Sequence, residues 1–193
     1  MIQSKTDYYH YLAQDQKALG LNNMSFNDKI INFISPNRIW KFQKTLRKLE
    51  YYKNCKNNGI NKLYYNFLRY KFKNISLKLG FSIPPNVFGP GLSIAHYGTI
   101  VINSATKVGK NCRIHVCVNI GASGGEKEAP QIGDNVYIAP GAKIYGNINI
   151  ANNTAIGANA VVHKSIEEEG FLIAGNPAKK IKEIDIKRII KHA

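Results

Sequence analysis

From residue 88 onward, large apolar residues recur every six positions along the chain. The position directly after these anchors is often Gly or Ala, and the position four residues after them is small or apolar. An α-helix cannot keep a period of six on one face, and a flat strand alternates every two residues. The pattern therefore predicts short strands that turn a corner every six residues and stack as coils. The anchors, with one double step of twelve, are Ile102, Val108, Ile114, Ile120, Ile132, Ile138, Ile144, Ile150, Ile156 and Val162.

The first 80 residues follow a helical period instead. In SPNRIWKFQKTLRKLEYYKN, Ser35 is the expected N-cap and Pro36 the expected first helical residue. A second helix is expected from about residue 60 to 79, and the prolines of SIPPN end it. Its apolar side is predicted to consist of Leu63, Phe67, Ile75 and Leu79. An earlier helix is expected within residues 4–19.

Charge separates the same two halves of the chain. The net charge is +15, and residues 1–80 hold 15 Lys and Arg against 4 Asp and Glu. Such a basic half suits a phosphorylated precursor or an anionic membrane surface, and it equally suits a solvated face. No zinc-finger, KH or RNP signature accompanies the charge, so nucleic acid is not expected as a partner.

The cysteines and the N-terminal residues indicate where in the cell the protein is expected. The three cysteines form no C-x-x-C pair, and the five-residue spacing of Cys112 and Cys117 does not suit zinc, so no metal is expected. The polar start MIQSKTDYYHYLAQDQ lacks the apolar core of a signal peptide, and no run of 18 apolar residues follows. We therefore expect a cytoplasmic protein, and peripheral contact with the inner membrane surface is an alternative expectation.

Three stretches give the coiled half a family resemblance: GLSIAHYGTIVI, PQIGDNVYIAPGAKIYGNI and IAGNPAKKI. They resemble the left-handed parallel β-helix of the hexapeptide-repeat acyltransferases, in the serine acetyltransferase branch. The resemblance implies an α+β chain, with a helical N-terminal domain over 1–80 and a left-handed β-helix acetyltransferase domain over 81–178. Residues 179–193 are expected to form a basic C-terminal tail or helix. The resemblance also implies a homotrimer that uses acetyl-CoA as cosubstrate.

Two histidines inside the apolar repeat are the candidate catalytic residues. His96 interrupts the period, because Ile94 and Ile102 are eight residues apart, and the extra residues predict a side chain turned out of the wall. By the resemblance, His96 is the general base that deprotonates the acceptor hydroxyl. His115 follows the anchor Ile114, and either a role beside the acetyl-CoA groove or a packed structural role fits it. Cys112 falls on an inward position and is expected to be an apolar filler.

The acceptor site departs from the serine acetyltransferase pattern. Ala95 stands where that family has an Asp before the catalytic His, and GFSIPPN puts Ser82 and Pro84 at the places of a further Asp and His. Removing a buried charged partner typically costs about 2–5 kcal/mol of binding. The expected acceptor is therefore a sugar or polysaccharide hydroxyl, with L-serine as the alternative. A non-catalytic trimeric scaffold and an acyl-carrier-protein donor are further alternatives. The residues assigned to acceptor binding are Ala95, Tyr97, Glu128 and Asp15.

The resemblance also assigns the acetyl-CoA groove to the later coils. Backbone near Gly121 and Ala122 is expected to face the thioester, because glycine lets a ligand approach the backbone closely. Lys179 and Lys180 in GNPAKKI match basic residues that meet the CoA phosphates, although a solvated lysine pair is the alternative. The pantetheine arm is expected along Ala139, Ala142, Gly157 and Ala158.

Overall fold

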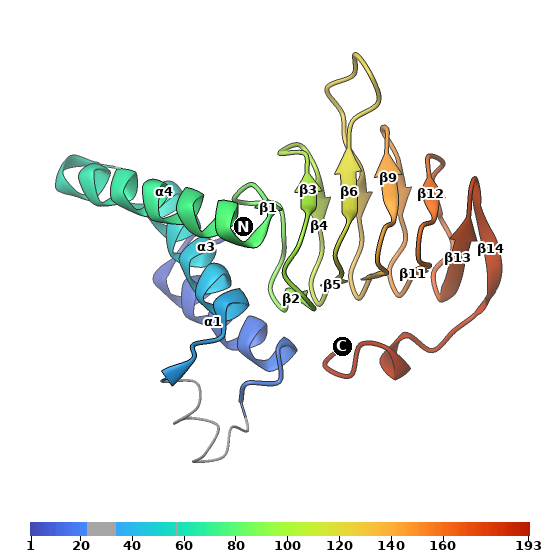
Figure 1. Cartoon of the computed structure of the whole chain (residues 1–193), viewed down its shortest axis with the longest axis horizontal. Helices are drawn as coiled ribbons and strands as arrows, with labels where there is room; N and C mark the ends of the chain where they lie inside the picture. Colours follow the sequence, from blue (N-terminus) through green and yellow to red (C-terminus); the bar gives the residue numbers. More distant parts are fainter. Residues whose placement is uncertain (23–33, 57) are drawn as a thin grey trace.

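A computed structural model describes residues 1–22, 34–56 and 58–193 of the chain. Within these residues, the helices lie to one side of a stack of short strands, and the C-terminal segment runs back beneath the stack toward the helices (Figure 1). The helices are α1 (Lys5–Ala18), α3 (Arg38–Cys55) and α4 (Gly59–Leu79). The predicted change from helices to strands therefore falls at Gly80, whose φ of 76° ends α4 in the left-handed conformation.

The strands form three sheets, one for each side of the coil, and every pairing between coils is parallel; only the last strand, β14, is antiparallel to its neighbour. The first sheet is β1 (Phe81–Ser82), β3 (Ile100–Ile102), β6 (Val118–Gly121), β9 (Lys143–Tyr145) and β12 (Val161–Val162). The second is β4 (Lys107–Val108), β7 (Gln131–Ile132) and β10 (Asn149–Ile150). The third is β2 (Ser93–Ile94), β5 (Arg113–Ile114), β8 (Tyr137–Ile138), β11 (Ala155–Ile156), β13 (Phe171–Gly175) and β14 (Ala178–Glu183).

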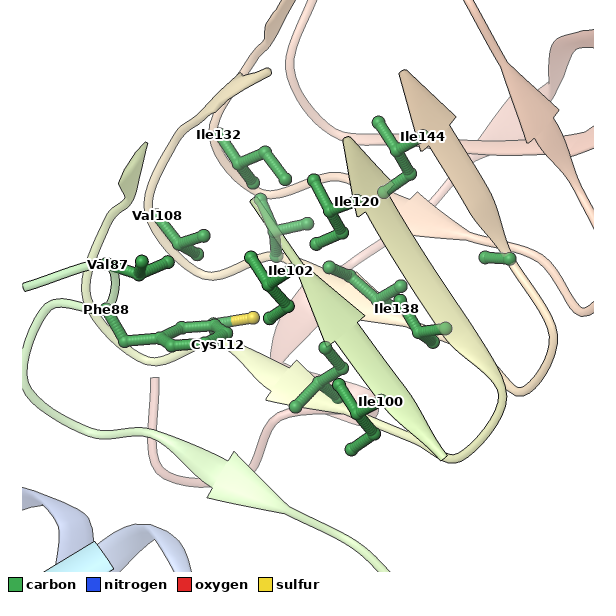
Figure 2. Close-up of a cluster of buried hydrophobic side chains, with 14 of the residues drawn as sticks. Val87, Phe88, Ile100, Ile102, Val108, Cys112, Ile120, Ile132, Ile138 and Ile144 are labelled. Carbon is green, nitrogen blue, oxygen red and sulfur yellow. The ribbon is translucent and has the colours of Figure 1, made fainter. Parts of the chain in front are cut away.

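The predicted anchors line the interior of this β-helix. Ile102 pairs with Ile120, which pairs with Ile144, so one apolar column runs along the first sheet. Figure 2 shows these side chains turned inward beside those of Val108 and Ile132 from the second sheet. All five side chains are at most 5% exposed. The period of six is therefore confirmed as three sides of a coil around one core.

The double step between anchors 120 and 132 is a loop. Residues 122–130 leave the coil after β6 and project beyond the neighbouring strands (Figure 1). The chain returns at Gln131, whose backbone pairs with Lys107 on one side and Asn149 on the other. This coil is thus longer than a regular one, and the register of the sheets is unchanged.

One corner of the coil is held by an asparagine ladder. Asn111, Asn135 and Asn153 have φ of 57°, 55° and 55°, a conformation that Asn tolerates better than most residues. Their side-chain amides bond in series, with 2.9 Å between Asn111 Nδ2 and Asn135 Oδ1 and between Asn135 Nδ2 and Asn153 Oδ1. Gly91 occupies the preceding place in this column, where a Cβ would come 2.3 Å from Asn111 Oδ1.

The helices close the open end of the β-helix. The Phe42 ring lies 5.3 Å from the Phe72 ring and 5.0 Å from the Phe81 ring, centroid to centroid, so α3, α4 and β1 share one aromatic contact. Phe42 and Leu46 also belong to the same buried cluster as the coil anchors. The core of the helical part is therefore continuous with the core of the β-helix.

Two details of the predicted helices were wrong. α3 begins at Arg38, and its N-cap is Asn37, whose Oδ1 accepts from Trp40 N at 2.9 Å; the expected cap was Ser35. On α4, Leu63 and Phe67 are 72% and 56% exposed, whereas Leu79 is buried. The buried side of α4 is centred on Leu68, Ser76 and Leu79, so both sides of this helix are apolar. Within the described residues, no helix is long and apolar enough to cross a membrane.

The C-terminal segment is a strand followed by a short helix. β14 pairs antiparallel with β13, and a 3-10 helix (Ile186–Arg188) follows. Ile186 and Ile190 are buried against the third sheet with Ala155. Lys17 Nζ on α1 donates to the carbonyl of His192 at 3.5 Å. The predicted basic tail is therefore packed along the β-helix as far as the helical part.

Candidate active site

The corner between β2 and β3 carries His96. Ala95 N donates to the carbonyl of Ile114 at 3.0 Å, and Gly98 N donates to the carbonyl of Leu79 at 2.9 Å. Both ends of the corner are thus fixed, one to the next coil and the other to the end of α4. The His96 side chain between them is exposed. The two residues that interrupt the period of six lie in this corner, and they turn the imidazole out of the wall as predicted.

His115 lies beside His96 on the next coil. Their ring centroids are 5.9 Å apart, and the His115 ring is 5.3 Å from that of Tyr137 on the following coil. We call His96, His115 and Tyr137 the ring column. Burial lowers the pKa of His115, and the charges of Arg113 and His96 lower it further. The surroundings of His115 therefore favour its neutral form, and the neighbouring His96 ring is exposed.

Sequence reasoning missed one member of this column, Tyr137. Tyr137 precedes the anchor Ile138, and its contact with His115 follows from the pairing of β5 with β8. The repeat pattern carried that signal, because residues one coil apart lie side by side. His115 Nε2 is buried and has no hydrogen-bond partner among the described residues. A ligand hydroxyl or a water is the kind of group that would satisfy this atom.

The other predicted acceptor residues are spread over two places. Ala95 is half-buried and Tyr97 is 70% exposed, and both flank His96 on the same corner. Glu128 is exposed in the loop 122–130. The loop leaves the first sheet after β6, whereas the corner joins the third sheet to the first.

Asp15 does not face a ligand, which corrects its assignment to acceptor binding. Its carboxylate is fully buried against the Arg47 guanidinium, with 2.8 Å between Oδ2 and Nε. Its Oδ1 accepts from the backbone N–H groups of Gly91 and Leu92, at 2.9 Å each. Arg47 also bonds Glu50 and the carbonyls of residues 88 and 89. Asp15 therefore ties α1 and α3 to the first coil and has no oxygen left for a substrate.

The positions predicted to meet acetyl-CoA divide into inner and outer ones. Gly121 and Ala122 are half-exposed at the end of β6, and Ala158 is exposed at a corner. Ala142 is fully buried and Ala139 is 5% exposed, because both lie on the inner side of the coil. Their side chains therefore do not face a ligand, and contact of the pantetheine arm with their backbone stays a prediction. At Gly157, a Cβ would lie 2.8 Å from the Cβ of Ala174, so coil packing alone requires a glycine there.

The two lysines of GNPAKKI have different surroundings. Lys180 is paired with Glu168, and its Nζ lies 3.8 Å from the centroid of the Phe171 ring. Lys179 lines a hollow of about 170 Å³ together with His163, Lys164 and Pro177. Three nitrogen-bearing side chains around one small hollow suit the phosphates of a CoA tail. Within the residues the structure describes, no cluster of His, Cys, Asp and Glu has the arrangement of a metal site.

Comparison with known proteins agrees with this geometry. The family described as bacterial transferase hexapeptide (six repeats) matches residues 129–164. A serine acetyltransferase of Staphylococcus aureus (strain Mu50) is 40% identical over 107 residues, which are 54% of this chain and 50% of the relative. The chain therefore spans about half the length of such relatives.

Solved structures extend the similarity to the helices. A serine acetyltransferase of Brucella abortus strain S19 in complex with coenzyme A has a TM-score of 0.74 and 26% identity. The similarity covers 94% of this chain and 70% of that one. A Neisseria gonorrhoeae serine acetyltransferase in complex with serine has a TM-score of 0.70 and 26% identity, over 93% of this chain and 71% of that one. The chain is thus a left-handed β-helix protein with hexapeptide repeats, and it is similar to serine acetyltransferases in the sequence of about half its length and in the fold of nearly all of it.

Proposed function

We propose that the protein is an acetyl-CoA-dependent O-acetyltransferase in which His96 is the general base. The observation that carries the proposal is the exposed His96 on its lengthened corner, with the His115 ring 5.9 Å away on the next coil. A side chain that titrates near neutral pH suits the removal of a hydroxyl proton as the oxygen attacks. The names of the similar proteins support the same activity.

His96 performs both proton transfers of the reaction. Its imidazole takes the acceptor hydroxyl proton while the oxygen adds to the carbonyl carbon of the acetyl thioester. The tetrahedral intermediate then collapses, the C–S bond breaks, and the CoA sulfur takes the proton from His96. Neither step needs a covalent enzyme intermediate. Burial raises the pKa of the Cys112 thiol, so this cysteine is a packing residue and not the nucleophile.

Residues on the outside of the later coils fit acetyl-CoA. Bound acetyl-CoA supplies the activated acetyl group. Gly121 and Ala122 would lie along the thioester end, and Ala158 along the arm. Lys179, with Lys164 in the same hollow, would meet the phosphates. The similar Brucella protein has been solved in complex with coenzyme A, which supports coenzyme A as the kind of ligand.

L-serine is the acceptor that the comparisons favour over a sugar. The similar proteins are named serine acetyltransferases, and one of the structures contains serine. A sugar hydroxyl remains the second candidate because of one observation: no carboxylate stands at Ala95, and Asp15 is not available to replace one. A zwitterionic acceptor would therefore need a charged partner from another part of the protein.

The assembly is proposed to be a homotrimer, as the family resemblance implies. Sedimentation would then give three times the chain mass of 21.6 kDa. Location in the cytoplasm and peripheral contact of the basic helices with an anionic membrane stay predictions. A non-catalytic scaffold is the competing function, and it predicts the same assembly without turnover.

Thiol release from acetyl-CoA tests the proposal. The protein is assayed with L-serine, with a panel of free and nucleotide-linked sugars, and with no acceptor. Release that depends on serine assigns the enzyme to serine O-acetylation, and release that depends on a sugar assigns it to the second candidate. Absence of release with every acceptor, from protein that binds acetyl-CoA, would refute the enzyme and leave the scaffold.

A further inference from the structure

A hollow of about 880 Å³ lies where α4 meets α3 and the start of the β-helix. Side chains of α3 and α4 line one side, and the segment 81–85 lines the other. Its volume is within the range of small-molecule sites in proteins, about 300–1,000 Å³. It is separate from the small hollow at Lys179, which lies at the far end of the β-helix.

Three cations surround this hollow. Lys53 comes from α3, and Arg69 and Lys73 come from α4. Among the described residues, none of the three forms a salt bridge. No acidic residue lines the hollow, and the sequence of α4 contains no Asp or Glu. Three uncompensated cations around one concave surface favour a ligand with several negative charges.

The rest of the lining favours a ligand that also carries a ring and hydroxyl groups. Tyr65 and Tyr70 line the hollow, and the Arg69 guanidinium lies 5.8 Å from the centroid of the Tyr65 ring. Ser76 is 9% exposed, and its Oγ has no hydrogen-bond partner within the described residues. Buried hydroxyls are normally bonded, so this atom is suited to a polar atom of a ligand. Inorganic phosphate alone would leave the tyrosines uncovered.

The hollow adjoins the corner that carries His96. Gly98 N donates to the carbonyl of Leu79, the last residue of α4, and Ile100 N donates to the carbonyl of Gly80 at 3.1 Å. At Gly80, a Cβ would come 3.0 Å from the backbone carbon of Gly98. The same short segment, 79–81, therefore borders both the hollow and the His96 corner.

We propose that this hollow binds a phosphorylated sugar, of the nucleoside diphosphate-sugar class, as the acetyl acceptor. Lys53, Arg69 and Lys73 hold the phosphates, and Tyr65, Tyr70 and Ser76 contact the ring and its hydroxyls. The acceptor role rests on the proposed function and develops its sugar branch, whereas the binding itself does not depend on turnover.

Calorimetry on the full chain without acetyl-CoA tests the binding, with UDP-N-acetylglucosamine, UDP and inorganic pyrophosphate as probes. Saturable binding that is tighter for the UDP compounds than for pyrophosphate is expected. The variant K53E/K73E should weaken it about tenfold or more, because two phosphate contacts are replaced by repulsion. The matched control K71E/K78E makes the same change of charge at two exposed α4 lysines outside the lining, and it should stay within about twofold.

Three outcomes would overturn the proposal. One is the lack of saturable binding by all three probes at millimolar concentration. The second is an equal loss of affinity in K53E/K73E and K71E/K78E, which would indicate a general effect of charge. The third is displacement of the UDP probe by CoA, which would assign the cations to the donor. If binding and its lysine dependence persist while no acceptor is acetylated, the proposed function fails and the site stands.

Discussion

The rings of His96 and His115 lie 5.9 Å apart on adjacent coils, with the first exposed and the second packed against Tyr137. Parallel pairing of β2 with β5 produces this contact, since Ala95 N bonds the carbonyl of Ile114. The outer ring is free to meet an acceptor, and the inner ring is held in place. The two histidines therefore differ in exposure and packing, and each gives a separate prediction.

Replacing His96 with Ala should lower the rate of acetyl transfer by about 10²–10⁴-fold, the usual contribution of a general base. Affinity for acetyl-CoA should change little, because the residues proposed to hold it lie on later coils. Steady-state thiol release gives kcat, and calorimetry gives the dissociation constant. The matched control is His10→Ala, which removes an exposed histidine on α1, away from the proposed acetyl-CoA site. Full activity of His96→Ala would exclude His96 as the base.

The stability of the protein should fall as the pH drops from about 7 to 5.5. Burial lowers the pKa of both His115 and His192, so the unfolded chain binds protons that the folded chain does not. The free energy of unfolding therefore rises with pH up to the unfolded pKa of about 6.5, and levels off above it. Urea unfolding at a series of pH values measures the slope. His115→Gln and His192→Gln should each flatten it, whereas His10→Gln should not.

Replacing Arg47 with Met should destabilise the fold by about 3–5 kcal/mol, because Asp15 and Glu50 would be left buried without their counter-charge. The control is Lys110→Met, which breaks an exposed pair with Asp134 at 3.5 Å and should cost less than about 1 kcal/mol. Urea unfolding of the two variants provides the comparison. Similar small losses in both would show that the buried pair adds nothing to stability.

The sequence predicted the β-helix because burial and period coincide there. In each coil the anchor side chain, such as that of Ile120 or Ile144, is buried in the interior. No other regular secondary structure keeps one face buried with a period of six residues. The exposed position of His96 was also predictable from the sequence, because His96 lies where the six-residue period is interrupted. The hand of the coil does not follow from the period, and only the family resemblance supplied it.

The helical half was less predictable because its contacts are distant in sequence. Arg47 reads as a surface charge on α3, yet its partners include Asp15, 32 residues earlier, and the carbonyls of residues 88 and 89. Asp15 was assigned to a substrate for the same reason. Leu63 and Phe67 fit a helical apolar stripe, but α4 has two such stripes, and α3 covers the other one.

Replacing Asn135 with Ala should destabilise the β-helix by about 2–3 kcal/mol. The left-handed conformation at φ 55° costs a residue with a Cβ about 1–2 kcal/mol, and the two ladder hydrogen bonds contribute about 1 kcal/mol in addition. Asn135→Gly should cost less than Asn135→Ala, because glycine adopts this conformation without strain. The control is Asn147→Ala, an exposed position outside the ladder, with a change within about 0.5 kcal/mol. Thermal unfolding ranks the three variants, and an Ala variant as stable as the Gly variant would refute the conformational argument.

Replacing Lys179 with Glu should weaken binding of CoA about tenfold and binding of dephospho-CoA less. CoA carries one phosphate that dephospho-CoA lacks, and the added carboxylate would repel that phosphate. Lys180→Glu provides the matched change of charge at the next residue, whose Nζ already pairs with Glu168 and lies on the Phe171 ring. Its effect on CoA should be smaller than that of Lys179→Glu. Calorimetric titration of each variant with both ligands yields four affinity ratios. If the two variants lose affinity equally for CoA and dephospho-CoA, the hollow at Lys179 does not hold a CoA phosphate, and the tail of the cosubstrate lies on another part of the later coils.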